Sequence, residues 1–111
     1  MNLSYEGIGQ WAATFACGEV KEGEVVKISA DDTVAACGAG DGFCGVVLSV
    51  ARDGGACTVA LGGMVTVPCT SAPALGWAKL SADGSGGVKA DTSGREYRVV
   101  RAGDDTVTFV L

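Results

Sequence analysis

Apolar and polar residues alternate with a period of two through most of the chain. This spacing is typical of strands that bury one face, because successive side chains of a strand point to opposite sides. Residues 43–51 are the clearest case, since Cys44, Val46, Leu48 and Val50 form an unbroken apolar face. Clusters of Gly, Asp and Pro bound such segments. The pattern predicts strands over residues 24–29, 43–51, 56–61, 64–69, 77–81, 97–102 and 106–111.

About seven short strands separated by turn residues are typical of a small all-β sandwich or barrel. A chain of 111 residues has the length of a single domain, which we expect to comprise residues 19–111. Residues 8–17 would place Trp11 and Phe15 on one side of a short helix, but an extended arm fits them equally well. Residues 1–18 are therefore predicted to be an N-terminal arm or short helix.

Two glycines, Gly62 and Gly63, separate two predicted strands and allow three arrangements. A two-residue hairpin loop would bring Val59 opposite Thr66, whereas a three-residue loop would bring Val59 opposite Val67. The second choice keeps the apolar faces together, and we favour it because burial determines register. One long strand kinked at the glycines, with its pairing partners elsewhere, is the third arrangement. The alternation alone leaves all three open.

Two other turns are predicted from their residues. Residues 52–55 read Arg-Asp-Gly-Gly, and Asp-Gly supplies the positive φ that a tight hairpin requires. Residues 103–105 read Gly-Asp-Asp between the last two predicted strands, which we expect to form a hairpin.

The chain is acidic, with 8 Lys and Arg against 13 Asp and Glu and a net charge of −5. Nucleic acids and anionic membranes attract positive surfaces, so neither is an expected partner. Arg95, Arg98 and Arg101 lie close together in the sequence. On a regular strand Arg95 and Arg101 would share one face and Arg98 would point to the other, which splits the cluster. Residues 54–78 carry no charge, but their glycines, prolines and alternation predict strands rather than a membrane helix.

Five cysteines occur without any C-x-x-C pair, so a structural zinc site is not expected. The first residues lack the basic and apolar regions of a secretory signal, and we expect synthesis in a reducing cytoplasm. There the thiols would be packed as small hydrophobic groups. If residues 62–63 lie in the favoured hairpin, Cys57 and Cys69 become cross-strand neighbours.

No residue points to catalysis. The chain has no histidine, which is the commonest acid or base at neutral pH, and no phosphate-binding glycine motif. The adjacent acids at 31–32 and 104–105 fit exposed turns. We therefore expect a protein that is not an enzyme and that has no catalytic residue, metal or cofactor.

Binding through a surface is the function class that remains. Aromatic side chains anchor interfaces when they are not in the core. The candidate interface residues are Trp11, Phe15, Trp77 and Tyr97.

The order of several segments resembles the phage capsid cement proteins, a family of small β-rich head-decoration proteins. The resemblance rests first on residues 23–29 (GEVVKIS), 41–47 (DGFCGVV) and 53–68 (DGGACTVALGGMVTVP). It continues through residues 75–80 (LGWAKL) and 94–111, which begin GREYRVV and end TVTFVL. The similar region covers about residues 19–111, and residues 1–18 match no part of the family pattern.

The resemblance implies a phage or prophage structural protein that decorates and stabilises the assembled capsid by non-covalent contacts. The implied partner is the major capsid protein, the implied location is the capsid surface of the virion, and the implied assembly is a small homo-oligomer such as a trimer. We expect residues 1–18 to supply part of the contact. Two alternatives stay open, namely a small β-barrel module that binds a sugar or peptide and a phage head-completion or tail component. A pocket lined by Trp77, Tyr97 or Trp11 would favour the ligand-binding module.

Overall fold

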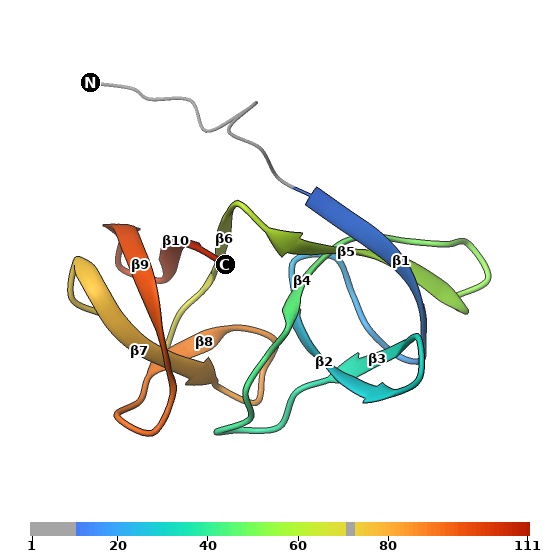
Figure 1. The fold of residues 1–111 in the computed structure, drawn as a ribbon, viewed down its shortest axis with the longest axis horizontal. Helices are drawn as coiled ribbons and strands as arrows, with labels where there is room; N and C mark the ends of the chain where they lie inside the picture. Colours follow the sequence, from blue (N-terminus) through green and yellow to red (C-terminus); the bar gives the residue numbers. More distant parts are fainter. Residues whose placement is uncertain (1–10, 71–72) are drawn as a thin grey trace.

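The computed structural model describes residues 11–70 and 73–111, which fold into a closed five-stranded barrel joined to a second five-stranded sheet (Figure 1). All regular elements in these residues are strands, which confirms the all-β prediction. The barrel contains β1 (Trp11–Cys17), β2 (Val25–Ala30), β3 (Thr33–Ala36), β4 (Gly45–Val50) and β5 (Ala56–Gly62). The second sheet contains β6 (Met64–Pro68), β7 (Gly76–Ala82), β8 (Val88–Ala90), β9 (Arg95–Ala102) and β10 (Thr106–Val110).

The described residues thus contain three strands more than the predicted seven, namely β1, β3 and β8. Both β3 and β8 are short, with four and three residues, and their sequences carry little alternation. Neighbouring strands supply the hydrogen bonds that keep such segments extended. Their formation therefore depends on tertiary contacts more than on local pattern.

The expectation of an N-terminal arm or short helix is corrected for residues 11–17. This segment is β1, which pairs antiparallel with β5 from Trp11 to Ala16 and parallel with β3 at Ala16 and Cys17. It is part of the barrel wall, so removing residues 1–18 would take a strand out of the fold. Residues 1–10 lie outside the described residues.

The barrel closes in the order β1-β3-β2-β4-β5 around its own apolar core. Val26, Val34, Val47 and Val59 point into it from four different strands, and Phe15 packs against them from β1. The predicted apolar face of residues 43–51 is corrected here, because Val47 is buried in the barrel core whereas Leu48 is 39% exposed. Val46 is buried in the other core, so β4 has a buried side chain on both of its faces.

The second sheet has the order β6-β10-β9-β7-β8, and a bridge between Cys69 and Val88 brings its two edges together. Its core is centred on three aromatic rings. Phe43 stacks on Tyr97 with ring centres 5.0 Å apart, and Phe109 meets both rings edge-on. Because Phe43 lies just before β4 of the barrel, this cluster ties the two halves into one domain.

The favoured hairpin at Gly62 and Gly63 is wrong, and the kinked strand with partners elsewhere is confirmed. β5 pairs with β1 and β4 in the barrel, whereas β6 pairs with β10 in the second sheet. Gly63 has a φ of 89°, a conformation that glycine adopts without strain, and it marks the crossing between the two halves. Cys57 and Cys69 accordingly belong to different cores and are not neighbours.

Both other turns are confirmed. Gly54 has a φ of 74° in the turn between β4 and β5, and the Ala51 amide donates to the Ala56 carbonyl across it. β9 and β10 form the last hairpin, in which the Gly103 amide donates to the Thr106 carbonyl.

Candidate functional site

The outer face of the second sheet carries a row of side chains that cross four strands. Trp77 on β7 is the partner of Arg98 on β9, Arg98 is the partner of Val110 on β10, and Val110 is the partner of Met64 on β6. The residues on either side of them in sequence, such as Ala78, Tyr97 and Phe109, face the core. Trp77 is 63% exposed, although tryptophan normally buries most of its surface.

Trp77 and Arg98 form a stacked pair at one end of this row. The Arg98 guanidinium carbon lies 4.9 Å from the centre of the Trp77 ring. A cation over an aromatic face is attracted by the ring quadrupole, so each side chain restrains the other. Tryptophan and arginine are also the residues most enriched among the dominant contacts of protein interfaces.

Two further apolar side chains extend the exposed surface. Leu75, which precedes β7, is 66% exposed, and Val100 on β9 is 36% exposed. We call Leu75, Trp77, Arg98, Val100 and Val110 the outer patch.

A β-bulge in β9 corrects the predicted split of the arginines. Arg101 pairs with Thr108 and Val99 with Phe109, so Val100 is an extra residue. A bulge resets the alternation, and Arg101 therefore lies on the outer face with Arg98. Arg95 instead lies over the Tyr97 ring, 5.2 Å from its centre.

Trp77 lines two shallow hollows. One has a volume of about 230 Å³ and the other about 350 Å³. Ligand pockets usually measure roughly 300–1,000 Å³, so both are at or below the small end of that range. The first hollow is lined by Trp77, Arg95, Glu96, Tyr97, Arg98, Val110 and Leu111. The second is lined by Pro73, Ala74, Trp77, Ala78, Lys79, Ala90, Asp91 and Thr92.

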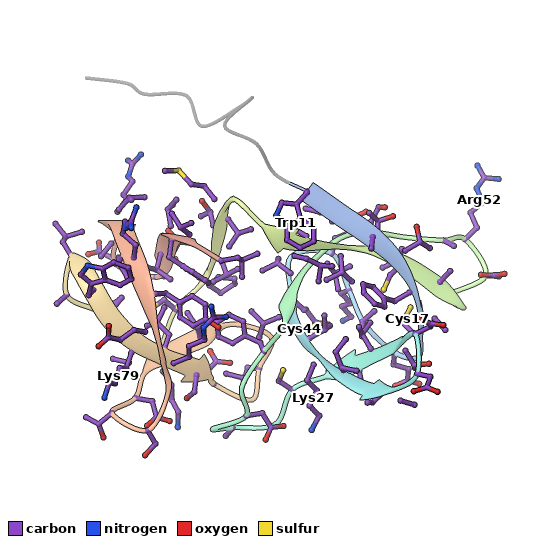
Figure 2. All side chains as sticks on the ribbon, in the orientation of Figure 1. Trp11, Cys17, Lys27, Cys44, Arg52 and Lys79 are labelled. Carbon is purple, nitrogen blue, oxygen red and sulfur yellow. The ribbon has the colours of Figure 1, made fainter. Side chains whose placement is uncertain are left out.

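The four candidate interface residues have different surroundings. Trp77 and Trp11 are exposed, at 63% and 62%, and Figure 2 shows Trp11 at the start of β1. Phe15 is half-buried against the barrel core. Tyr97 is only 3% exposed between Phe43 and Phe109, so its selection as an interface residue is corrected. Among the described residues no ring contact joins any two of the four.

Three thiols, those of Cys37, Cys44 and Cys57, are held in their protonated form. Burial raises the pKa of Cys37 and of Cys57 to about 11, and it also raises the pKa of Cys44. None of the five cysteines is in a disulfide, and the described residues contain no group of His, Cys, Asp and Glu arranged to hold a metal ion. A protonated thiol is a poor nucleophile at neutral pH.

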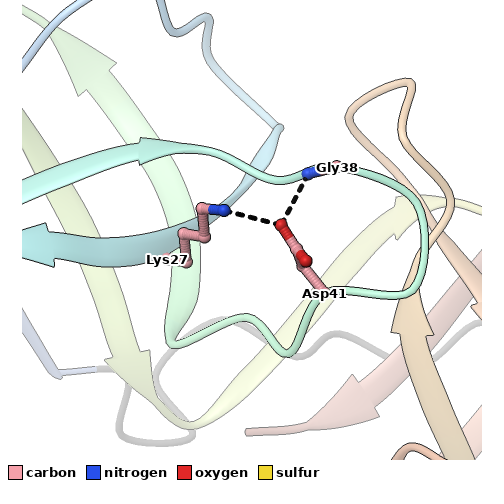
Figure 3. Close-up of polar contacts among 3 residues, drawn as sticks. All are labelled: Lys27, Gly38 and Asp41. Carbon is pink, nitrogen blue, oxygen red and sulfur yellow. Dashed lines mark hydrogen bonds and ion pairs between the residues drawn. The ribbon is translucent and has the colours of Figure 1, made fainter.

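Three carboxylates with lowered pKa values accept hydrogen bonds that hold loops in place. Asp41 accepts hydrogen bonds from the Lys27 ammonium at 2.7 Å and the Gly38 amide at 2.9 Å, and these contacts lower its pKa (Figure 3). Burial by itself would raise the pKa of Asp83, but hydrogen bonds from Thr70 and two backbone amides outweigh it and lower the pKa. Hydrogen bonds from Ser81 and from the Ser93 amide lower the pKa of Asp91.

These shifts predict a flat stability profile near neutral pH. The lowered pKa values of Asp41, Asp83 and Asp91 give stability that is present above about pH 4 and is lost as the pH falls through their folded values. The raised pKa values of Cys37 and Cys57 give stability that is complete below about pH 9 and is lost as the pH rises toward 11. The chain has no histidine to titrate between these limits.

Urea unfolding at a series of pH values measures this profile. The midpoint should stay constant from about pH 5 to pH 8 and fall on both sides. The Asp41→Asn variant should lose part of the fall on the acid side. A midpoint that changes strongly between pH 6 and pH 7 would contradict the assignment.

No family model matches the chain, and no curated protein matches it. Within the described ranges, no helix is long and apolar enough to cross a membrane.

Proposed function

We propose that this chain is a phage or prophage structural protein that decorates and stabilises the assembled capsid through non-covalent contacts of the outer patch. The major capsid protein is the proposed partner and the capsid surface of the virion the proposed location. The protein would act there as a small symmetric homo-oligomer.

The outer patch is the observation that carries this proposal. Trp77 and Arg98 restrain each other, and Leu75 and Val100 add apolar area beside them. All but Leu75 lie on paired strands, so little conformational entropy is lost when a partner covers the patch. A patch of this composition fits a broad protein surface.

A decoration function also fits the energetics of binding. A protein that binds only the assembled lattice stabilises it by mass action, in proportion to the logarithm of its free concentration over its dissociation constant. Several copies joined in one oligomer would bind far more tightly than one copy, provided that all of them reach the lattice together.

Co-sedimentation with assembled capsids tests the proposal. The capsids come from the phage or prophage that encodes the chain, and the wild-type protein should pellet with them. Trp77→Ala should weaken binding by about 30-fold or more, because truncating a dominant interface residue costs about 2 kcal/mol or more. Arg52→Ala is the control, since Arg52 is exposed in the turn between β4 and β5 and lies at the end of the barrel away from the second sheet (Figure 2).

The outcomes separate two failures. Wild-type protein that stays in the supernatant would contradict the capsid function. Wild-type and Trp77→Ala proteins that pellet equally would retain the function but exclude the outer patch as the contact.

The hollows beside Trp77 favour a second candidate, a module that binds a sugar or peptide. Trp77 lines both hollows, and Arg95, Glu96 and Arg98 place polar groups around one of them. Saturable quenching of tryptophan fluorescence by a sugar or peptide, present in the wild-type protein and lost in Trp77→Ala, would support this candidate. No quenching across a panel of such ligands would count against it.

A further inference from the structure

Strand β1 has one edge that is only partly paired. Its first edge runs along β5 from Trp11 to Ala16, but β3 reaches its second edge only at Ala16 and Cys17. The Ala16 amide donates to the Asp32 carbonyl at 2.9 Å, on the β3 side. The Cys17 amide donates to the Gly55 carbonyl at 3.2 Å, on the β5 side.

The amides of Ala16 and Cys17 thus point to opposite sides of β1, and this alternation fixes the direction of the other N–H and C=O groups of the strand. Between Ala12 and Ala16 the register with β5 is regular, so even-numbered residues direct their N–H and C=O groups away from β5. Ala12 and Thr14 therefore present these groups on the second edge, where no described residue pairs with them.

The free edge lacks the features that usually block pairing with another chain. Proteins protect such edges with charged residues or proline. Residues 11–17 read WAATFAC and contain neither, and the side chains of Ala12 and Thr14 are exposed. An extended strand could therefore add to this edge through main-chain hydrogen bonds.

We propose that the partner is β1 of a second copy of this chain, paired antiparallel across a two-fold axis at Ala13. Ala12 then pairs with the partner's Thr14, and Thr14 pairs with the partner's Ala12. Each such pair exchanges two main-chain hydrogen bonds, which gives about four in all. A two-fold contact is self-complementary in this way by definition.

The side chains of β1 fit the same register. It brings Trp11 opposite the partner's Phe15 and the two Ala13 side chains opposite each other. Aromatic cross-strand pairs stabilise sheets, and both rings have exposed surface, since Trp11 is 62% exposed and Phe15 is half-buried. The small alanines let the strands approach closely at the axis.

Self-pairing accounts for these features better than an unrelated peptide does. The free groups at Ala12 and Thr14 match each other under a two-fold operation, and no charge on β1 opposes a like charge across the axis. A register centred on Thr14 is excluded because it needs the Ala16 amide, which already donates to Asp32.

This contact specifies the homo-oligomer of the proposed function as a dimer, in place of the trimer that the family resemblance implies. It rests on β1 alone and not on capsid binding. Measurements on the isolated protein therefore test it separately from the decoration function.

Sedimentation equilibrium of the full chain measures the contact. Wild-type protein should reach twice the 11.1 kDa mass of the chain. Thr14→Pro removes a donor that points to the free edge and that the β1–β5 ladder does not use, so it should raise the dimer dissociation constant by about tenfold or more. Thr14→Val changes the side chain, keeps the donor and should remain dimeric.

A wild-type monomer, a wild-type trimer, or a Thr14→Pro variant that dimerises normally would overturn the proposal. Hydrogen exchange of the wild-type chain gives a second test that does not depend on how the proline variant folds. The Ala12 and Thr14 amides should exchange more slowly as protein concentration rises. Exchange at these amides that is fast and independent of concentration would also overturn it.

Discussion

Replacing Phe109 with alanine should lower the free energy of unfolding by about 3–5 kcal/mol, the usual cost of truncating a buried phenylalanine. Phe109 is 0% exposed and packs edge-on against Phe43 and Tyr97, at 5.8 and 5.1 Å between ring centres. The truncation removes both contacts and leaves a cavity where the barrel meets the second sheet. Because a small domain is stable by about 5–15 kcal/mol, this single change would remove much of its stability.

Denaturant unfolding, followed by a signal that reports on the strands of both sheets, measures the free energy of unfolding of the wild-type and Phe109→Ala proteins. Trp77→Ala is the matched control, because that aromatic side chain is exposed and should change stability by less than about 1 kcal/mol. Equal losses of stability in Phe109→Ala and Trp77→Ala would show that the aromatic cluster does not hold the barrel and the second sheet together.

A single added methyl group at Gly45 should also be costly. A Cβ at this position would meet the Ala60 carbonyl oxygen and a methyl group of Val59, both on β5. The carbonyl belongs to the backbone and cannot rotate away, so β4 and β5 would have to separate within a closed barrel. We expect Gly45→Ala to lower stability by about 1–3 kcal/mol, as overpacking usually does.

Gly42→Ala provides the matched control, since a Cβ there would meet no atom within 4 Å. Its φ is also outside the positive region that favours glycine. That substitution should leave stability unchanged or raise it slightly, because alanine restricts the unfolded chain. Thermal unfolding compares the stability of the two variants. A Gly45→Ala protein as stable as Gly42→Ala would be evidence against close contact between β4 and β5 at Gly45.

The candidate site could be found in the sequence only in part. The sequence predicts Trp77 as an interface residue because this aromatic side chain stands outside the most regular strands, and the structure places it on the outer face. Unbroken alternation predicts that Arg98 and Arg101 lie on opposite faces, whereas the structure places both on the outer face. The bulge at Val100 depends on the pairing of β9 with β10, which no pattern within β9 reveals. Aromatic character also makes Tyr97 a candidate, but alternation leaves open which face of a strand is covered, and Tyr97 is buried.

The sequence by itself determined the all-β class, seven of the ten strands in the described residues and the Asp-Gly turn, because period-two alternation and positive-φ turn residues are properties of a few adjacent residues. Tertiary structure decided which strands pair. It separated β5 from β6 at Gly63, although a hairpin at the same glycines would have satisfied the same alternation. It also drew residues 11–17 into the barrel wall, where β3 and β5 provide hydrogen bonds that the segment cannot provide for itself. Alternation shows that a strand has a face to bury, whereas the strands that pair with its edges and the side chains that cover its face come from elsewhere in the chain.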